Sequence, residues 1–152
     1  MQKKPERSIC RNMKVLIDTN IILDVFCKRP GLYEDSAKIF KLCEIRKISG
    51  VISALTVPNI IYILRKELDA EKTKEILDNL FLIFSVADLK ADDLQKAASM
   101  NFKDYEDAIQ SACAARIKAN YIITRNIKDF TKSKVAAIKP ADFLHVTYST
   151  TL

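Results

Sequence analysis

The chain has 152 residues, which fits one ordinary domain, and a hydrophobic content of 49% allows a sizeable buried core. This composition excludes a disordered chain, and the presence of only 2 glycines and 4 prolines argues against a barrel or sandwich with many tight turns. The formal net charge of +6 favours an anionic partner, of which nucleic acid is the commonest.

The sequence also bears on the compartment. No apolar run approaches the roughly 20 residues of a membrane-spanning helix, so no membrane partner is expected. The 4 cysteines are scattered singly without a C-x-x-C pair, which favours a reducing cytoplasm over a disulfide framework or a zinc site. Residues 1–12 are basic but lack the apolar stretch of a secretory signal. We therefore expect a basic N-terminal arm over 1–12 and a single cytoplasmic domain over 13–152.

From residue 13 onward, short apolar runs alternate with segments of helical period. Strands are predicted at 15–17, 50–53, 82–86, 121–124 and 135–138, although the start of the third could belong to the preceding helix. Helices are predicted at 35–47, 57–68, 71–80, 92–100 and 105–119. This alternation predicts an α/β fold, a three-layer α/β/α sandwich with a mostly parallel central sheet of four or five strands. Ligands of such sheets bind outside the carboxyl ends of the strands.

The first predicted strand ends in Asp18, Thr19 and Asn20, directly before the apolar start of a helix. A carboxylate at this position lies at the edge of the sheet where the carboxyl ends of the parallel strands meet, which we call the mouth of the sheet. Asp18 suits a catalytic role there, and it equally suits a helix N-cap. Both interpretations stay open on local grounds.

The second predicted strand ends at Ser53. Thr56 and Pro58 then indicate a helix start, because proline is tolerated in the first turn of a helix. Asn59 falls in that first turn, where its amide could reach the mouth of the sheet. The alternative is a solvated helix-start asparagine.

An acidic cluster opens the helix predicted at 105–119. Asp104 is suited to cap this helix, and acidic residues in a first turn are favoured by the helix dipole. Asp107 is followed at helical spacing by small residues that would let this face press against the sheet and carry Asp107 inward. A carboxylate turned inward is costly unless it meets a cation, so we interpret Asp107 as functional. Glu106 is interpreted as a solvated helix-start residue.

A further polar cluster follows the fourth predicted strand. It contains Thr124, Arg125, Asn126, Lys128 and Asp129. The two basic residues would place positive charge beside the carboxylates, where a phosphate backbone could be held.

Two acids that are distant in sequence and converge at one sheet edge suit a hard divalent cation. Mg²⁺ and Mn²⁺ prefer oxygen ligands, and Mg²⁺ typically takes one or two carboxylates together with waters and phosphate oxygens. Asp18 and Asp107 are the predicted metal ligands, and hydrolysis of a phosphodiester by metal-activated water is the chemistry they imply.

Four motifs in this order resemble those of PIN domains, and most of all the VapC-like toxin branch of small ribonucleases paired with an antitoxin. They are Val15–Asn20, Ile52–Thr56, Asp104–Ala108 and Ile123–Phe130, and the resemblance runs from Met13 to Leu144. It implies a metal-dependent endoribonuclease acting on RNA, with Asp18 and Asp107 as the acids. It also implies that Asn20 orients the first acid, with Ser53 and Thr124 in support. An antitoxin protein and a homodimer are the expected protein partners.

The chain departs from the family pattern at two positions. Asn59 stands where the family usually has a glutamate, and Asn126 stands where the fourth acid commonly falls. Both are kept as predicted catalytic positions, and Asp104 or Asp129 could compensate for the lost charge. The departures support an alternative, in which a PIN-like domain without cleavage activity serves as an RNA-binding or protein-binding scaffold.

Two other protein classes fit the sequence less well, and one pair of helices has two interpretations. A receiver-type signalling domain is also a small α/β sheet with a strand-end aspartate, although the acidic pair and late lysine it requires are not evident. A Ser-His-Asp hydrolase is poorly supported, because the only histidine, His145, lies outside any nucleophile motif. The apolar helix pair 57–68 and 71–80 is either a deep core or an interface for a second copy or an antitoxin.

Overall fold

The computed structural model describes residues 13–149, so the predicted arm 1–12 lies outside the described residues. Within the described part, a sheet of five strands has the order β3-β2-β1-β4-β5, and every neighbouring pair is parallel. The strands are β1 (Lys14–Ile17), β2 (Ser49–Ser53), β3 (Ser85–Ala87), β4 (Tyr121–Ile123) and β5 (Ala136–Ile138). This arrangement confirms the predicted α/β fold with a parallel central sheet.

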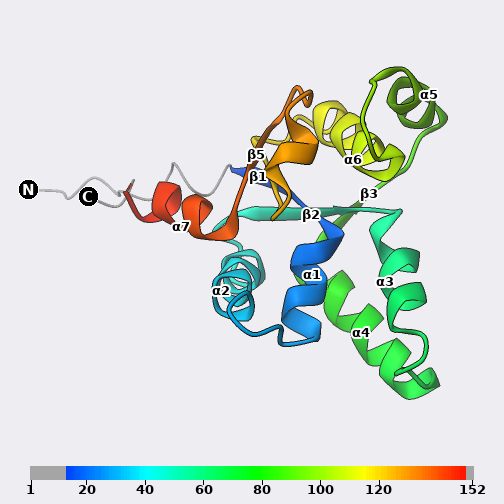
Figure 1. Ribbon diagram of the computed structural model, residues 1–152. Helices are drawn as coiled ribbons and strands as arrows, with labels where there is room; N and C mark the ends of the chain where they lie inside the picture. The colour runs from blue at the N-terminus through cyan, green and yellow to red at the C-terminus, as the bar shows by residue number, and fades with distance from the viewer. Residues whose placement is uncertain (1–12, 150–152) are drawn as a thin grey trace, which may run out of the picture.

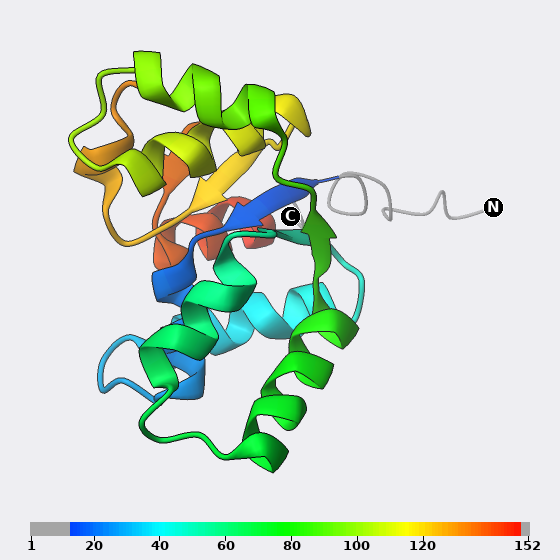
Figure 2. The same ribbon diagram turned by 90° about the vertical axis from the view of Figure 1, so that its right-hand side faces the viewer.

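Helices cover both faces of the sheet (Figure 1). On one face lie α1 (Thr19–Phe26), α2 (Tyr33–Glu44), α3 (Thr56–Leu64), α4 (Ala70–Ile83) and α7 (Pro140–Ser149). On the other lie α5 (Ala91–Ser99), α6 (Tyr105–Arg116) and the short 3-10 helix η1 (Ile127–Phe130). Figure 2 shows the sheet between α5 and α6 on one side and α3 and α4 on the other.

The central strand shows why its sequence is apolar without alternation. Val15 and Ile17 are fully buried in the larger core, which they share with residues of α1, α2, α4 and α7. Leu16 points to the opposite face, where it packs with Cys113 of α6 and Phe130 of η1. A strand covered by helices on both faces buries every side chain, so a continuous apolar run results.

The strand order places the site. The chain passes from β1 outward to β2 and β3, and then returns to the other side of β1 with β4 and β5. The direction of winding therefore switches between β1 and β4, and such a switch point opens a crevice at the carboxyl ends of the strands. Ile17 is in register with Ile123, so the residues that follow them, Asp18 and Thr124, leave the sheet side by side. A receiver domain has the order 2-1-3-4-5, so this alternative is wrong.

Several element boundaries differ from the predicted ones: the helices predicted at 35–47 and 57–68, for example, end at Glu44 and Leu64, and two other differences have a clear cause. The predicted strand 82–86 begins only at Ser85, because α4 continues through Ile83 and the Phe84 amide still donates to the Leu80 carbonyl at 2.9 Å. The predicted helix 105–119 ends at Arg116, and Lys118 follows with a φ of 56°, a left-handed conformation that stops a helix.

The apolar pair α3 and α4 contributes to the core and also to the surface. Ile60, Leu64 and Leu80 are buried, but large apolar side chains on the same two helices are exposed. These exposed residues are Tyr62, Ile63, Phe81 and Leu82. The pair is therefore more than a deep core. Among the described residues, no helix is both long and apolar enough to cross a membrane.

Candidate active site

Asp18 stands where β1 ends and α1 begins, and its carboxylate is held from two sides. The Thr19 amide donates to Oδ1 at 2.8 Å, so Asp18 is the N-cap of α1. The Thr124 hydroxyl donates to Oδ2 at 2.8 Å from the end of β4. The side chain is only 5% exposed. The N-cap interpretation is confirmed, and because the cap leaves lone pairs free on both oxygens, the functional role of Asp18 stays a prediction beside it.

Burial raises the pKa of Asp18 above its usual range. The hydrogen bonds from Thr124 and the Thr19 amide act against this rise, because they stabilise the ionised form. The charge of Glu106 adds to the rise, and that of Arg125 lowers it. This carboxylate is buried, is oriented by donors and lies close enough to charged groups to respond to them.

Asp107 lies in the first turn of α6, at the same mouth. Its pKa is raised to about 7, first by burial, then by the charge of Asp18 and finally by those of Asp104, Asp129 and Glu106. All four neighbours that shift it are carboxylates. At neutral pH the mouth therefore concentrates negative charge, and an added cation would relieve the repulsion.

The acidic N-terminus of α6 is built as the sequence predicts at Asp104. The Asp104 carboxylate accepts from the Glu106 amide at 2.8 Å and from the Asp107 amide at 3.4 Å, so it caps the helix. Capping fixes the first turn of α6. The position of this first turn determines where the Asp107 carboxylate lies relative to the strand ends.

Asn59 and Glu106 form a contact that sequence reasoning missed. The Asn59 amide donates to Glu106 Oε1 at 2.6 Å, which joins the first turn of α3 to the first turn of α6. Glu106 is exposed, as expected for a helix-start residue, but its charge acts on both Asp18 and Asp107. No local signal could have linked the two, since they lie 47 positions apart.

A buried hydroxyl cluster supports the floor of the mouth. Thr56 Oγ1 lies 3.1 Å from the Thr19 hydroxyl and 3.4 Å from the Ser53 hydroxyl, and it accepts from the Gln110 amide at 3.1 Å. All four side chains are buried. Ser53 is a predicted supporting residue. The sequence marks Thr56 only as a helix start, and it gives no sign of Gln110, because nothing local marks a polar residue of α6 as buried.

The polar residues after β4 differ in their placement. The backbone amide of Asn126 donates to the Thr124 hydroxyl at 3.0 Å, which holds that hydroxyl against Asp18. Lys128 and Asp129 are exposed on η1, and Asp129 is near enough to raise the pKa of Asp107. Asn20 is partly buried, and within residues 13–149 its side chain makes no hydrogen bond. Its predicted role in orienting the first acid stays a prediction.

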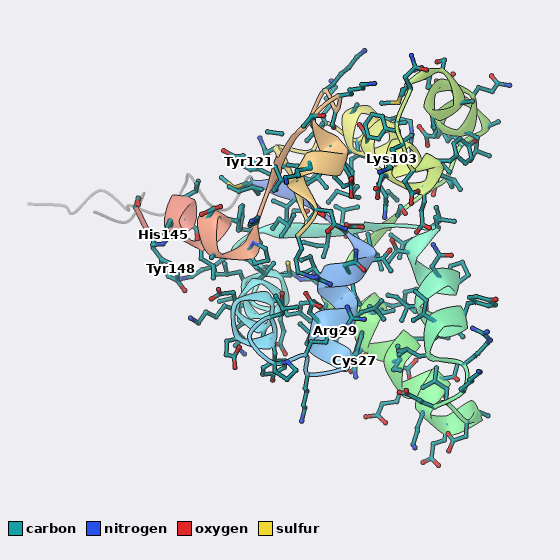
Figure 3. All side chains as sticks on the ribbon, in the orientation of Figure 1. Cys27, Arg29, Lys103, Tyr121, His145 and Tyr148 are labelled. Atoms are coloured by element: carbon teal, nitrogen blue, oxygen red, sulfur yellow. The ribbon has the colours of Figure 1, made fainter. Side chains whose placement is uncertain are left out.

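Arg125 is engaged by a residue that the sequence reasoning missed. Its Nε lies 2.7 Å from Oδ2 of Asp24, a fully buried aspartate in α1. Arg29, in the turn that follows α1 (Figure 3), donates to the other oxygen of Asp24 at 3.1 Å. Figure 3 also shows His145 with Tyr148 on α7, at the opposite side of the molecule from α3, and His145 is exposed. His145 therefore takes no part in this site.

The donors at the mouth suit a hard divalent cation bound with help from solvent. Asp18 and Asp107 offer carboxylate oxygens, which Mg²⁺ and Mn²⁺ prefer. Within the described residues, no three histidine, cysteine or acidic side chains come together closely enough to hold an ion by themselves. A Mg²⁺ site with one or two carboxylates, waters and substrate phosphate oxygens fits this set.

Comparison with known proteins supports the fold. The chain is 24% identical to Ribonuclease VapC1 of Aquifex aeolicus over 135 residues, which cover 86% of this chain and 92% of that protein. VapBC2 from Rickettsia felis, solved bound to a DNA fragment from its promoter, has a TM-score of 0.66 at 18% identity, over 84% of this chain and 98% of that one.

A toxin–antitoxin complex from Klebsiella pneumoniae has a TM-score of 0.63 at 23% identity, over 83% of this chain and 97% of that one. The family model of the PIN domain matches residues 14–128, which include Asp18, Asp104, Glu106 and Asp107. By fold, by the placement of its acids and by this match, the chain belongs to the PIN domain family.

Proposed function

We propose that this protein is a metal-dependent endoribonuclease of the cytoplasm, which hydrolyses RNA phosphodiester bonds with Mg²⁺ or Mn²⁺ held by Asp18 and Asp107. The observation that carries the proposal is the repulsion within the mouth. Asp107 has a pKa of about 7 because burial and four other carboxylates disfavour its charge. A divalent cation held by Asp18 and Asp107 would remove that penalty, which supports a cation-binding role for both.

The protein residues divide the remaining work. Thr124 and the Thr19 amide fix the two oxygens of Asp18, so its remaining lone pairs have a set direction. The metal that these residues would hold would supply a water of lowered pKa and would offset the charge that grows on the phosphate. Asn59 is itself neutral, but it donates a hydrogen bond to Glu106, and the negative charge of Glu106 acts on Asp107. Asn126 holds the Thr124 hydroxyl through its backbone amide.

RNA as the substrate is supported by the charge of the chain and by its similarity to a protein named as a ribonuclease. The net charge is +6, and Lys128 is exposed on η1 next to the mouth. Arg125 lies on the same loop, and we assign both residues to the RNA backbone. Replacing Arg125 by glutamine should weaken the binding of oligouridine RNA in EDTA. The slope of the logarithm of the association constant against the logarithm of the salt concentration should become shallower by about 0.7, as expected for one lost phosphate contact on a single strand.

Protein partners are supported by the apolar surface of α3 and α4. Four large apolar side chains there are exposed, and Leu82 is the most open at 67%. A groove of about 350 Å³ is lined by parts of α1, α3 and α4, among them Phe26, Leu64 and Ile76. Exposed apolar side chains together with an apolar groove favour an interaction surface. We assign this face to an antitoxin or to a second copy of the chain, and the mass measured by light scattering, with and without the product of a neighbouring gene, separates the two.

The first test is calorimetric titration of Mn²⁺ into the metal-free protein, beside Asp18→Asn and Asp107→Asn. The proposal expects binding in the wild type that both substitutions abolish. Asp142→Asn is a matched control, because Asp142 is also an aspartate in the first turn of a helix, but in α7. It should bind Mn²⁺ as the wild type does.

A second candidate function is a PIN-fold scaffold that binds RNA or protein without cleaving. The observation in its favour is that the described residues assemble no protein-only metal site, and that Asn59 and Asn126 are neutral. Retention of RNA binding in a wild type that takes up no Mn²⁺ at millimolar concentration, even with RNA present, would favour the scaffold over the nuclease.

A further inference from the structure

Asp24 is the most deeply buried charged residue among those described, and its ion pairs are with arginines, not with groups of the mouth. Its exposure is 0%, and each carboxylate oxygen faces a different arginine. Oδ1 accepts a hydrogen bond from Arg29 at 3.1 Å, and Oδ2 lies 2.7 Å from Nε of Arg125. The second contact is ionic without hydrogen-bond geometry. Burying a carboxylate in this way is costly, and two cations compensate it.

The position of Arg125 gives this pair a consequence for the site. Arg125 directly follows Thr124, whose hydroxyl is bound to Asp18 at 2.8 Å. The charge of Arg125 is close enough to lower the pKa of Asp18. Its side chain is 29% exposed, and within residues 13–149 its terminal nitrogens make no hydrogen bond. A guanidinium in this position could bind a phosphate, but it could also form an ion pair with Asp18 and so compete with a metal ion for that carboxylate.

We propose that Asp24 is a positioning residue that holds Arg125 and balances its charge, so that the arginine stands beside the metal-binding acids without occupying them. The inference rests on the proposed function, because it concerns the cation site of Asp18 and Asp107. Asp24 and Asp18 belong to one helix and its cap, so the anchor and the metal ligand form one rigid unit. The anchored arginine stays available to a phosphate of the RNA.

The test measures the affinity for Mn²⁺ by calorimetry without RNA, in the wild type and in Asp24→Asn. Asparagine keeps the shape of the side chain and removes its charge, which leaves Arg125 uncompensated beside Asp18. Binding should weaken by about tenfold or more, the scale of one unit charge near the site at an effective dielectric constant of about 20. The double variant Asp24→Asn with Arg125→Gln removes the free charge as well and should regain the affinity of wild type.

Asp93 provides a matched control. It is 1% exposed and pairs with a single arginine, Arg116, whose Nε lies 3.0 Å from its Oδ1. Arg116 is the last residue of α6, at the opposite end of that helix from Asp107. Asp93→Asn therefore makes the same change in charge and breaks the same kind of buried pair away from the mouth. It should lose stability and keep the wild-type affinity for Mn²⁺.

The outcomes separate the two claims. Unchanged Mn²⁺ binding by a folded Asp24→Asn variant, or failure of the double variant to restore it, would overturn the positioning role alone. Absence of Mn²⁺ binding by the wild type would overturn the proposed function, and the inference with it. If Asp24→Asn does not fold, Arg125→Gln alone decides the matter. It should bind Mn²⁺ at least as tightly as wild type, and weaker binding would show that Arg125 is not the competing charge.

Discussion

Replacing Asp107 by asparagine should flatten the pH dependence of stability in the metal-free protein. Asp107 has a folded-state pKa of about 7 against an ordinary value of 3.8. Between these values the folded protein holds a proton that the unfolded chain has released. The stability contributed by this proton is complete below pH 3.8 and is lost as the pH rises through about 7.

The shift of about three pKa units corresponds to about 4 kcal/mol, at 1.36 kcal/mol for each unit. Asp107 is only partly buried, so screening by solvent reduces this value. We expect the wild type to lose about 1–2 kcal/mol of unfolding free energy between pH 5 and pH 8 relative to Asp107→Asn. All other titrating groups are common to the two proteins, so the difference isolates this carboxyl group.

The assay is urea unfolding in EDTA at the two pH values, with Asp142→Asn as the control that should follow the wild type. Mn²⁺ added at the higher pH should restore the stability of the wild type but not that of Asp107→Asn, because a cation offsets the repulsion among the carboxylates. Parallel pH dependence in wild type and Asp107→Asn would refute the reasoning, since it would mean that Asp107 ionises in the folded protein as it does in the unfolded chain.

Three further changes test the surroundings of the mouth. Thr124→Val removes the donor to Asp18 and should cost about 1–3 kcal/mol in urea unfolding, and it should also weaken Mn²⁺ binding in calorimetry. Glu106→Gln keeps a hydrogen-bond partner for the Asn59 side chain but removes a charge. Carboxyl NMR should show the pKa of Asp107 falling by a fraction of a unit, because burial and the charge of Asp18 contribute more to its rise than Glu106 does. Gly50→Ala places a methyl group against a cysteine of α2 in the core, and should lower the unfolding free energy by about 1–3 kcal/mol. An unchanged denaturation midpoint in Thr124→Val or Gly50→Ala, or an unmoved Asp107 titration in Glu106→Gln, would contradict the corresponding contact.

Much of the site is decided by local sequence. A strand buried on both faces must be apolar throughout, so Val15–Ile17 identifies the central strand and places Asp18 at its end. Small residues along one face of α6 let that helix approach the sheet, which turns Asp107 toward the mouth. Alternation of strands and helices requires a parallel sheet, and parallel strands bring their carboxyl ends to one edge. The two main acids therefore follow from hydrophobic period and chain order.

The tertiary structure alone decided which side chains meet there. Strand order depends on how helices pack across the sheet, and it is this order that places Thr124 against Asp18 over a separation of 106 positions. The contact of Asn59 with Glu106 joins two helix starts, and the pairing of Asp24 with Arg125 joins α1 to the loop after β4. Local periodicity predicts whether a residue faces inward, but it carries no information on which distant residue it meets. Buried charges and shifted pKa values depend on such meetings, so only the folded chain reveals them.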